Sequence, residues 1–540
     1  MAVLSVKSFG GISPRTPARY LQDSQAQVAI NCPVFAGSLQ ALPGFGSTVT
    51  SLTKTGTPLT MYRFGQDIIS DTQYWFHWTT DVNVCRSQIA GDTSEWTFYT
   101  GDGTPKATYN SIALSGSNYP TVSRPLGIPA PIAAPTVVAG TPPTGPDIGL
   151  PETRVYAYTV VNAESGFEFE SAPSPASSSV DVYDTQSVTL SGFSSVPSGY
   201  TLTHRRIYRS VSGTYLFVAE IPLATTTYVD SVLPDDLGEE LPSLTWLPPP
   251  ADLKGLINLP NGMMAGFVGR DIYFCEPYHP HAWPLQYVQS VDYPIVGLGR
   301  IDNTLVVVTT GSPYFIQGAS PDAMVVVKSD LEQAGASKRS IVSSNNSVIY
   351  ASPDGLVMMT PAGSNLITEK YFTRAQWQAY FTPSTIVAFQ HDMKYVAFYD
   401  NGVTQGGFIY DMVSSQFILH NLYATCGYSD LLRDQLFLSF ADRTVKKWLA
   451  GSALTYTWRS KKFTAPYPMD FGCAQVQAEA YPVTCKVYRD GNLIHTQTVA
   501  SRLPFRLPVS VGLDWEIQLE GTSEVFSIDI AQNMEELASV

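Results

Sequence analysis

The chain has 540 residues, enough for about three or four domains. Only 14% of the residues are charged, and 46 acidic against 32 basic residues give a net charge of −14. Affinity for nucleic acid comes mainly from Lys and Arg, so this balance argues against a protein that grips DNA or RNA. The 40 Gly, 39 Pro, 30 Tyr and 25 Phe favour short strands and tight turns over long helices.

The N-terminal stretch MAVLSVKSFGGISPRTP lacks an apolar core and a small-residue cleavage site, so we expect no secretory leader. No stretch approaches the roughly 18 apolar residues that a membrane-spanning helix needs. The cysteines form no Cys-x-x-Cys pair and have no His at zinc-finger spacing. We therefore expect reduced, mostly buried thiols in a chain that folds in a cytoplasm: Cys32, Cys85, Cys275, Cys426, Cys473 and Cys485.

Residues 1–45 are expected to form an N-terminal arm, in which ARYLQDSQAQVAINC (18–32) is a candidate helix. Residues 46–128 begin a strand-turn-strand pattern, with TQYWFHWTTDVNVCRSQI (72–89) followed by SEWTFYTG (94–101). The pattern is then interrupted by the Pro/Gly-rich linker PAPIAAPTVVAGTPPTGPDIGLP (129–151). Strands at sandwich spacing follow, so we predict an inserted immunoglobulin-like or fibronectin-type β-sandwich over 129–248.

Residues 249–455 return to the repeated pattern. Apolar strand pairs turn at Gly269, Gly311, Gly355 and Gly402 and near Asp442, at intervals of about 40–47 residues. Such a period with only strands inside it is typical of the four-stranded blades of a β-propeller. We predict an all-β chain whose propeller has six or seven blades, including one near Trp75–Trp78.

Helix is expected in few places, of which RAQWQAYF (374–381) is the clearest, with Thr373 as its N-cap. After about residue 455 the period stops. Strand-like segments and a second Asp-Gly turn, at Asp490 and Gly491, predict a C-terminal β-sandwich over 456–540.

The segment CEPYHPHAWP brings Glu276, His279 and His281 close together in sequence. A carboxylate and two imidazoles could bind a divalent metal ion. The alternative is a surface loop between two strands, with Trp283 covering the blade, and we predict no metal site.

The densest basic cluster is HRRIYR, with His204, Arg205, Arg206 and Arg209. In a strand Arg205 and Arg209 lie on one face, and His204 and Arg206 on the other. The cluster could contact a phosphate or a glycan, or pair with the acidic run from Glu164 to Glu170.

The stretch SPDGLVMM resembles part of the Asp-box of sialidase-like propellers through Ser352, Asp354 and Gly355. Asp354 and Gly355 are adjacent, however, and the Thr-Trp close is missing; a hairpin turn explains the pair. A glycan hydrolase would also need two carboxylates at a defined separation. We therefore predict no enzyme and assign no catalytic, cofactor-binding or metal-binding residue.

The stretch SFGGISPRTPARYLQDSQAQVAINCPVFAGSLQALPGF (8–45) resembles the N-terminal arm of tail nozzle (tail tube or hub) proteins of short-tailed bacteriophages. LPNGMMAGFVGRDIYFCEPYHPHAWP resembles a blade segment of the same family, and the match extends diffusely over most of the chain. EQAGASKRSIVSSNNSVIYASPDGLVMMT and TYTWRSKKF resemble further stretches of that group. The inserted sandwich departs from the simplest pattern of the family.

The resemblance implies a structural virion protein that is assembled in the cytoplasm of a bacterial host and needs no cofactor. Copies would form a ring, commonly a homohexamer, that extends the DNA ejection channel below the head-to-tail connector and docks tail fibres or spikes. Double-stranded DNA would pass through it without being held, which suits an acidic chain. Two alternatives stay open: a receptor- or glycan-binding propeller at the tail tip, and a propeller glycan hydrolase.

Overall fold

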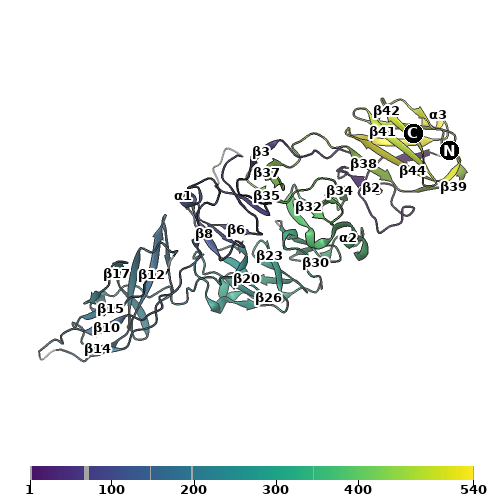
Figure 1. Cartoon of the computed structure of the whole chain (residues 1–540). Coiled ribbons are helices and arrows are strands. Elements are labelled where there is room, and N and C mark those ends of the chain that lie inside the picture. Colours follow the sequence, from purple (N-terminus) through teal and green to yellow (C-terminus); the bar gives the residue numbers. More distant parts are fainter. Residues whose placement is uncertain are drawn as a thin grey trace.

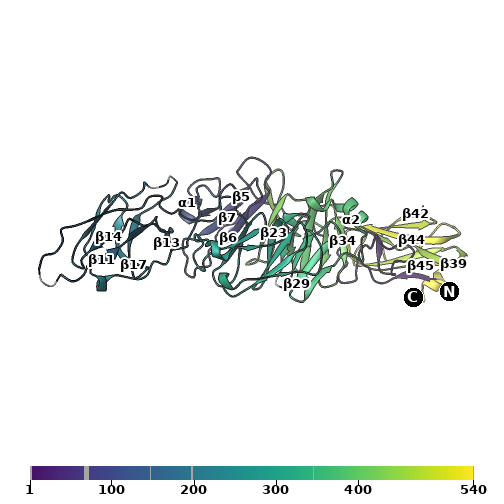
Figure 2. The same cartoon turned by 90° about the horizontal axis from the view of Figure 1, so that it is seen from below.

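The computed structural model describes residues 3–65, 72–145, 148–195, 197, 199–344 and 346–538. Three β modules lie in a row: a sandwich at one end, a propeller in the middle, and a second sandwich that carries both chain ends (Figure 1, Figure 2). No helix among the described residues is both long and apolar enough to cross a membrane.

The middle module is a propeller in which the described residues form seven antiparallel blades around one axis, one of them part of a ten-stranded sheet that continues into the C-terminal sandwich. The first strand of each sheet lies innermost, since these strands contact one another in a series around the axis. The innermost strands are β4 (Thr60–Arg63), β6 (Asn83–Arg86), β19 (Lys254–Asn258), β23 (Ile295–Ile301), β27 (Val342–Ser343), β31 (Val387–His391) and β35 (Cys426–Asp430).

Further strands extend each blade outwards, and the blade of β4 has only β5 (Trp75–Trp78) beside it in the described residues. The second strands of the other blades are β7 (Thr97–Thr100), β20 (Met264–Val268), β24 (Thr304–Thr309), β28 (Val348–Ala351), β32 (Lys394–Asp400) and β36 (Gln435–Ser439). The third strands are β8 (Lys106–Thr108), β21 (Asp271–Phe274), β25 (Tyr314–Gln317), β29 (Leu356–Thr360), β33 (Gln405–Asp411) and β37 (Thr444–Lys447). The fourth strands are β9 (Arg124–Pro125), β22 (Gln289–Ser290), β26 (Val325–Lys328), β30 (Gly363–Leu366), β34 (Phe417–His420) and β3 (Thr48–Ser51).

The predicted turns occupy one equivalent place in successive blades. Gly269, Gly311, Gly355, Gly402 and Asp442 each lie between the second and third strands. Gly269 has φ +60° and Gly402 φ +81°, where glycine avoids the strain of a side chain. At Gly355 the reason is space, because a Cβ would lie 2.2 Å from Thr368 Oγ1. The period therefore marked one propeller, as predicted.

The ring closes through strands that are far apart in sequence. β3 pairs antiparallel with β37, so the last blade takes its outer strand from the N-terminal part of the chain and the other three from residues 426–447. Neighbouring blades then bury apolar side chains between them; Phe64, Phe76 and Trp78 pack against Tyr99 of the next blade. Burial of this kind is what makes single blades depend on their neighbours.

The inserted segment forms a two-layer antiparallel sandwich with its own core, which includes Tyr156, Tyr158, Leu190 and Ile207. The larger sheet has the order β13 (Phe167–Glu170), β12 (Tyr156–Glu164), β16 (His204–Val211), β17 (Thr214–Pro222). The smaller sheets are β10 (Thr136–Ala139), β15 (Val188–Ser191), β18 (Tyr228–Asp230), and β11 (Glu152–Arg154) with β14 (Val180–Val182).

The C-terminal sandwich contains a strand from the N-terminal arm. One sheet has the order β1 (Val3–Val6), β45 (Val525–Ala531), β40 (Cys473–Ala478), β43 (Phe505–Arg506). The other contains β38 (Tyr456–Ser460), β44 (Gly512–Gly521), β41 (Val483–Arg489) and β42 (Asn492–Val499), with β39 (Phe463–Met469) also paired to β44. The register of β1 with β45, Val3 opposite Ala531, explains why the two chain ends lie together.

The helix predicted within residues 18–32 is wrong. These residues form turns and then β2 (Ala26–Ile30), which pairs antiparallel with β38 and parallel with β34. Backbone hydrogen bonds on both sides outweigh a weak local helix preference. By contrast, α2 (Arg374–Phe381) forms as predicted, with Thr373 and Gln376 in a capping box. The other described helices are α1 (Asn110–Ala113), α3 (Met534–Leu537) and five short 3₁₀ turns, among them η4 (Lys338–Ser340).

Candidate functional site

Glu276, His279 and His281 make structural contacts where the propeller meets the inserted sandwich. Glu276 Oε2 accepts a hydrogen bond from the Tyr287 hydroxyl at 2.9 Å, and His279 Nδ1 lies 2.9 Å from the Pro277 carbonyl oxygen. His281 is buried and accepts from the Glu170 backbone N–H at 3.3 Å. Burial, with His279 beside it, lowers the pKa of His281 to about 3, so its ring is neutral near pH 7.

The same place joins the inserted sandwich to the propeller. Phe169 of the insert lies 5.0 Å, ring centre to ring centre, from Trp96 of the β6–β9 blade and 4.8 Å from His281. The Tyr109 hydroxyl donates to Glu164 Oε1 at 2.5 Å. The insert is thus docked through a buried aromatic cluster as well as through its two linkers. Among the described residues, no group of three or more His, Cys, Asp or Glu side chains is placed to hold a metal ion.

The arginines of the basic cluster HRRIYR form hydrogen bonds and ion pairs with other residues of the insert. Arg206 donates to Glu168, Glu170 and Glu220 at 2.6, 2.9 and 2.9 Å, so the expected pairing with the acidic run is confirmed. Burial lowers the pKa of Arg206, but these three carboxylates outweigh it and raise the pKa overall.

The opposite face of this strand is buried. Arg209 donates to Asp230 Oδ2 at 2.9 Å, and both side chains are fully buried. Arg205 donates to the backbone carbonyl oxygen of Leu223 and lies over the ring of Phe193. These contacts leave Arg205 and Arg209 no route to a phosphate or a glycan.

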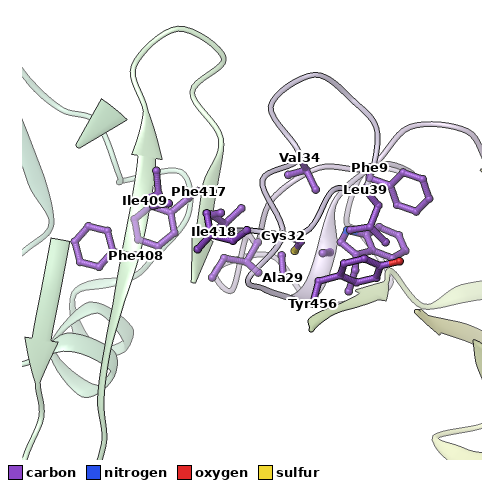
Figure 3. Close-up of a cluster of buried hydrophobic side chains, with 14 of the residues drawn as sticks. Phe9, Ala29, Cys32, Val34, Leu39, Phe408, Ile409, Phe417, Ile418 and Tyr456 are labelled. Carbon is purple, nitrogen blue, oxygen red and sulfur yellow. The ribbon is translucent and has the colours of Figure 1, made fainter. Parts of the chain in front are cut away.

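The N-terminal arm joins the propeller to the C-terminal sandwich. Figure 3 shows Phe417 and Ile418 of the last strand of one blade beside Ala29 and Cys32 of the arm, with Tyr456 beyond them. The second glycine of SFGGISP, Gly11, is required by close packing, because a Cβ there would lie 2.3 Å from the Phe417 carbonyl oxygen. Since β2 pairs with both β34 and β38, one hydrogen-bonded sheet runs from the blade into the sandwich.

All six cysteines lie within the described residues, and each is buried and outside any disulfide. Burial raises the pKa of Cys85, Cys275, Cys426 and Cys485 to about 12, so these thiols stay protonated and unreactive near neutral pH.

Sequence reasoning missed a cavity at the propeller axis. It is lined by Asp81, which lies before β6 of one blade, and by Lys338 and Arg339 of η4, which leads into β27 of another blade. Nothing in the linear pattern brings Asp81 to Lys338 and Arg339, because ring closure sets which strands are neighbours around the axis. In the described lining the only carboxylate is Asp81, which lies 3.2 Å from Lys338 Nζ.

The strand pairing defines the class, an all-β protein built on a propeller with an inserted and a C-terminal sandwich. No family model matches the chain, and no curated protein matches it. Among solved structures, apo AztD from Citrobacter koseri is 12% identical, with 69% of this chain and 100% of that chain covered at a TM-score of 0.29. TolB from Acinetobacter baumannii is 10% identical, with 65% and 79% covered at 0.25. BBS1N in complex with ARL6DN is 11% identical, with 76% and 96% covered at 0.28. TM-scores this low carry no argument about what this chain does.

Proposed function

We propose that this chain is a structural protein of the tail of a short-tailed bacteriophage, the tail nozzle. Copies form a ring that extends the DNA ejection channel below the head-to-tail connector and offers a docking surface to fibres or spikes. The proposal rests on the resemblance of residues 8–45 and of the blade segments to that family. The particle is the virion, which is assembled in the host cytoplasm.

The physical observation that best supports the proposal is the continuous coupling of the three modules. β2 is hydrogen-bonded to the propeller on one side and to the C-terminal sandwich on the other. The insert is held at the opposite end by the cluster around Trp96 and Phe169. Modules fixed in this way make an elongated strut (Figure 2), which can carry load between the parts of an assembly.

The arrangement at the axis favours this role over glycan hydrolysis. A hydrolase needs two convergent carboxylates, one of them free to donate a proton. The described axial lining offers Asp81, which is paired with Lys338 at 3.2 Å.

Electron microscopy of the purified full-length chain over a range of concentrations tests the proposal. We expect closed rings with a central hole, commonly of six copies. Monomers at every concentration, together with depolymerisation of host polysaccharide, would identify a propeller enzyme instead. Monomers that bind host glycan without cleaving it would identify a receptor-binding propeller.

A further inference from the structure

The cavity at the propeller axis has a volume of about 250 Å³. This is far above the roughly 10–15 Å³ that admits a single water molecule. The cavity lies where the innermost strands begin, and the strand residues in its wall come from five of the seven blades. The strand residues that line it are Thr60 of β4, Asn83 of β6, Leu298 of β23, Val387 and Phe389 of β31, and Cys426 and Gly427 of β35.

Two glycines create room for the residues around this cavity. A Cβ on Gly297 would lie 3.1 Å from Lys338 Cγ and 2.6 Å from Ile341 Cδ1. A Cβ on Gly427 would lie 2.9 Å from the Phe437 carbonyl oxygen and 3.0 Å from Phe389 Cζ. Side chains at these positions would displace the Lys338 stem or the wall, so the space is a built feature of β23 and β35.

The cavity collects more positive than negative charge. Lys338 and Arg339 enter it side by side from η4, and the exposed Lys254 adds to the positive field at Lys338. Lys338 pairs with Asp81. Arg339 Nη2 donates to the carbonyl oxygens of Leu59, at 2.9 Å, and Thr425. Within the described part of the chain Arg339 forms no ion pair, and these two carbonyl oxygens are its hydrogen-bond acceptors.

The excess of positive charge in the cavity is energetically unfavourable when no anion is bound. Burial lowers the pKa of Lys338, although Asp81 opposes it, and burial also lowers the pKa of Arg339. In both cases the protein environment disfavours the charged form. The chain as a whole carries a net charge of −14, so two cations side by side in a half-buried cavity need a local reason. Asn83 Oδ1, in the same wall, is buried and lacks a hydrogen-bond partner.

We propose that the axial cavity binds a small phosphate-type oxyanion, held by the Lys338 ammonium and the Arg339 guanidinium. A guanidinium and an ammonium side by side donate charge-assisted hydrogen bonds to such an oxyanion. Asn83 Oδ1 accepts a hydrogen bond from an oxygen of the ligand that still carries a proton. Inorganic phosphate has such a proton near neutral pH and sulfate has none, so the site prefers phosphate to sulfate. The bound anion ties together blades on opposite sides of the axis.

Isothermal titration of the full-length chain with inorganic phosphate and with sulfate tests the proposal. We expect phosphate to bind more tightly than sulfate and to raise the melting temperature as it saturates the site. Lys338→Gln should weaken phosphate binding about tenfold or more, the loss expected for one charge-assisted hydrogen bond. The matched control is Lys328→Gln, at an exposed lysine on an outer strand, which should bind as the parent does.

A second variant keeps the test decisive if Lys338→Gln fails to fold. Asp81→Asn keeps the shape of the side chain but removes the competing carboxylate, so phosphate should bind several-fold more tightly. No heat of binding at millimolar phosphate, or equal binding by Lys338→Gln and the parent, would overturn the site. Equal affinities for phosphate and sulfate would overturn the role of Asn83 and with it the phosphate preference.

Discussion

Arg209 and Asp230 form a fully buried ion pair in the insert, and Tyr156 donates a further hydrogen bond to Asp230 at 2.7 Å. Arg209→Leu leaves the carboxylate buried without its cation, so we expect a loss of about 3–5 kcal/mol in the free energy of unfolding. Calorimetry of the full chain measures the loss as a lower transition temperature for the insert.

The matched control for this prediction is the ion pair of the exposed Arg374 with the half-buried Asp354, 2.7 Å apart. Arg374→Leu should cost at most about 1 kcal/mol, since solvent screens the pair. If Arg209→Leu lowers the free energy of unfolding by no more than Arg374→Leu does, the buried ion pair does not stabilise the insert.

His420 makes the propeller sensitive to acid. Burial lowers the pKa of His420 from 6.5 to about 3. Below pH 6.5 the unfolded chain takes up a proton that the folded chain refuses, so stability is present above that pH and falls as the pH drops towards 3. The expected slope is about 1.4 kcal/mol per pH unit.

His420→Phe should remove this part of the acid sensitivity. Urea denaturation at several pH values between 7 and about 4 measures the difference from the parent. Phe398→Leu, in the same cluster, is the control and should lower stability equally at every pH. A parent and a His420→Phe variant with parallel pH profiles would contradict the assignment.

At the scale of elements, the arm depends on Gly11 beside β34. Gly11→Val would drive a side chain against the Phe417 backbone, whose carbonyl oxygen lies 2.3 Å from an added Cβ. We expect a cost of about 1–3 kcal/mol and faster hydrogen exchange in β2. Ala36→Val, at an exposed position of the same arm, should change neither quantity. Unchanged exchange in Gly11→Val would show that β2 is not fixed by this contact.

Elements whose structure depends on a few adjacent residues could be predicted from the sequence. The turns at Gly269 and Gly402 and the cap at Thr373 follow from the conformations of a few adjacent residues. The pairings of β3 with β37 and of β1 with β45 join short strands hundreds of residues apart and leave no local pattern. For the same reason the helix expected within residues 18–32 does not form, and the contact of Asp81 with Lys338 leaves no signal in the sequence.

At the scale of the whole molecule, the surplus of acidic residues bears on how DNA would pass. If copies ring a pore, acidic loops on its wall repel the polyanion from every side, so DNA is centred and not held. A basic wall would bind phosphates and release counterions at each contact, which slows passage. We therefore expect the acidity to be concentrated on the pore wall and not on the outer face.

Replacing two or three wall carboxylates per copy with Lys should slow DNA ejection. The effect should be larger at low salt than at high salt, because salt screens the new attraction. Ejection rates measured on particles that carry the variants give the comparison, with the same number of substitutions on the outer face as the control. Equal rates in all particles would assign the acidity to another cause, such as solubility.

Whether copies of the chain assemble into a ring separates a tail nozzle from a monomeric propeller. A reconstruction from electron micrographs of the purified protein shows whether copies close around a hole and which charges line it. We expect a closed ring, commonly of six elongated copies, around a pore with a net acidic wall. A chain that stays monomeric at every concentration, or a ring whose pore is net basic, would contradict it.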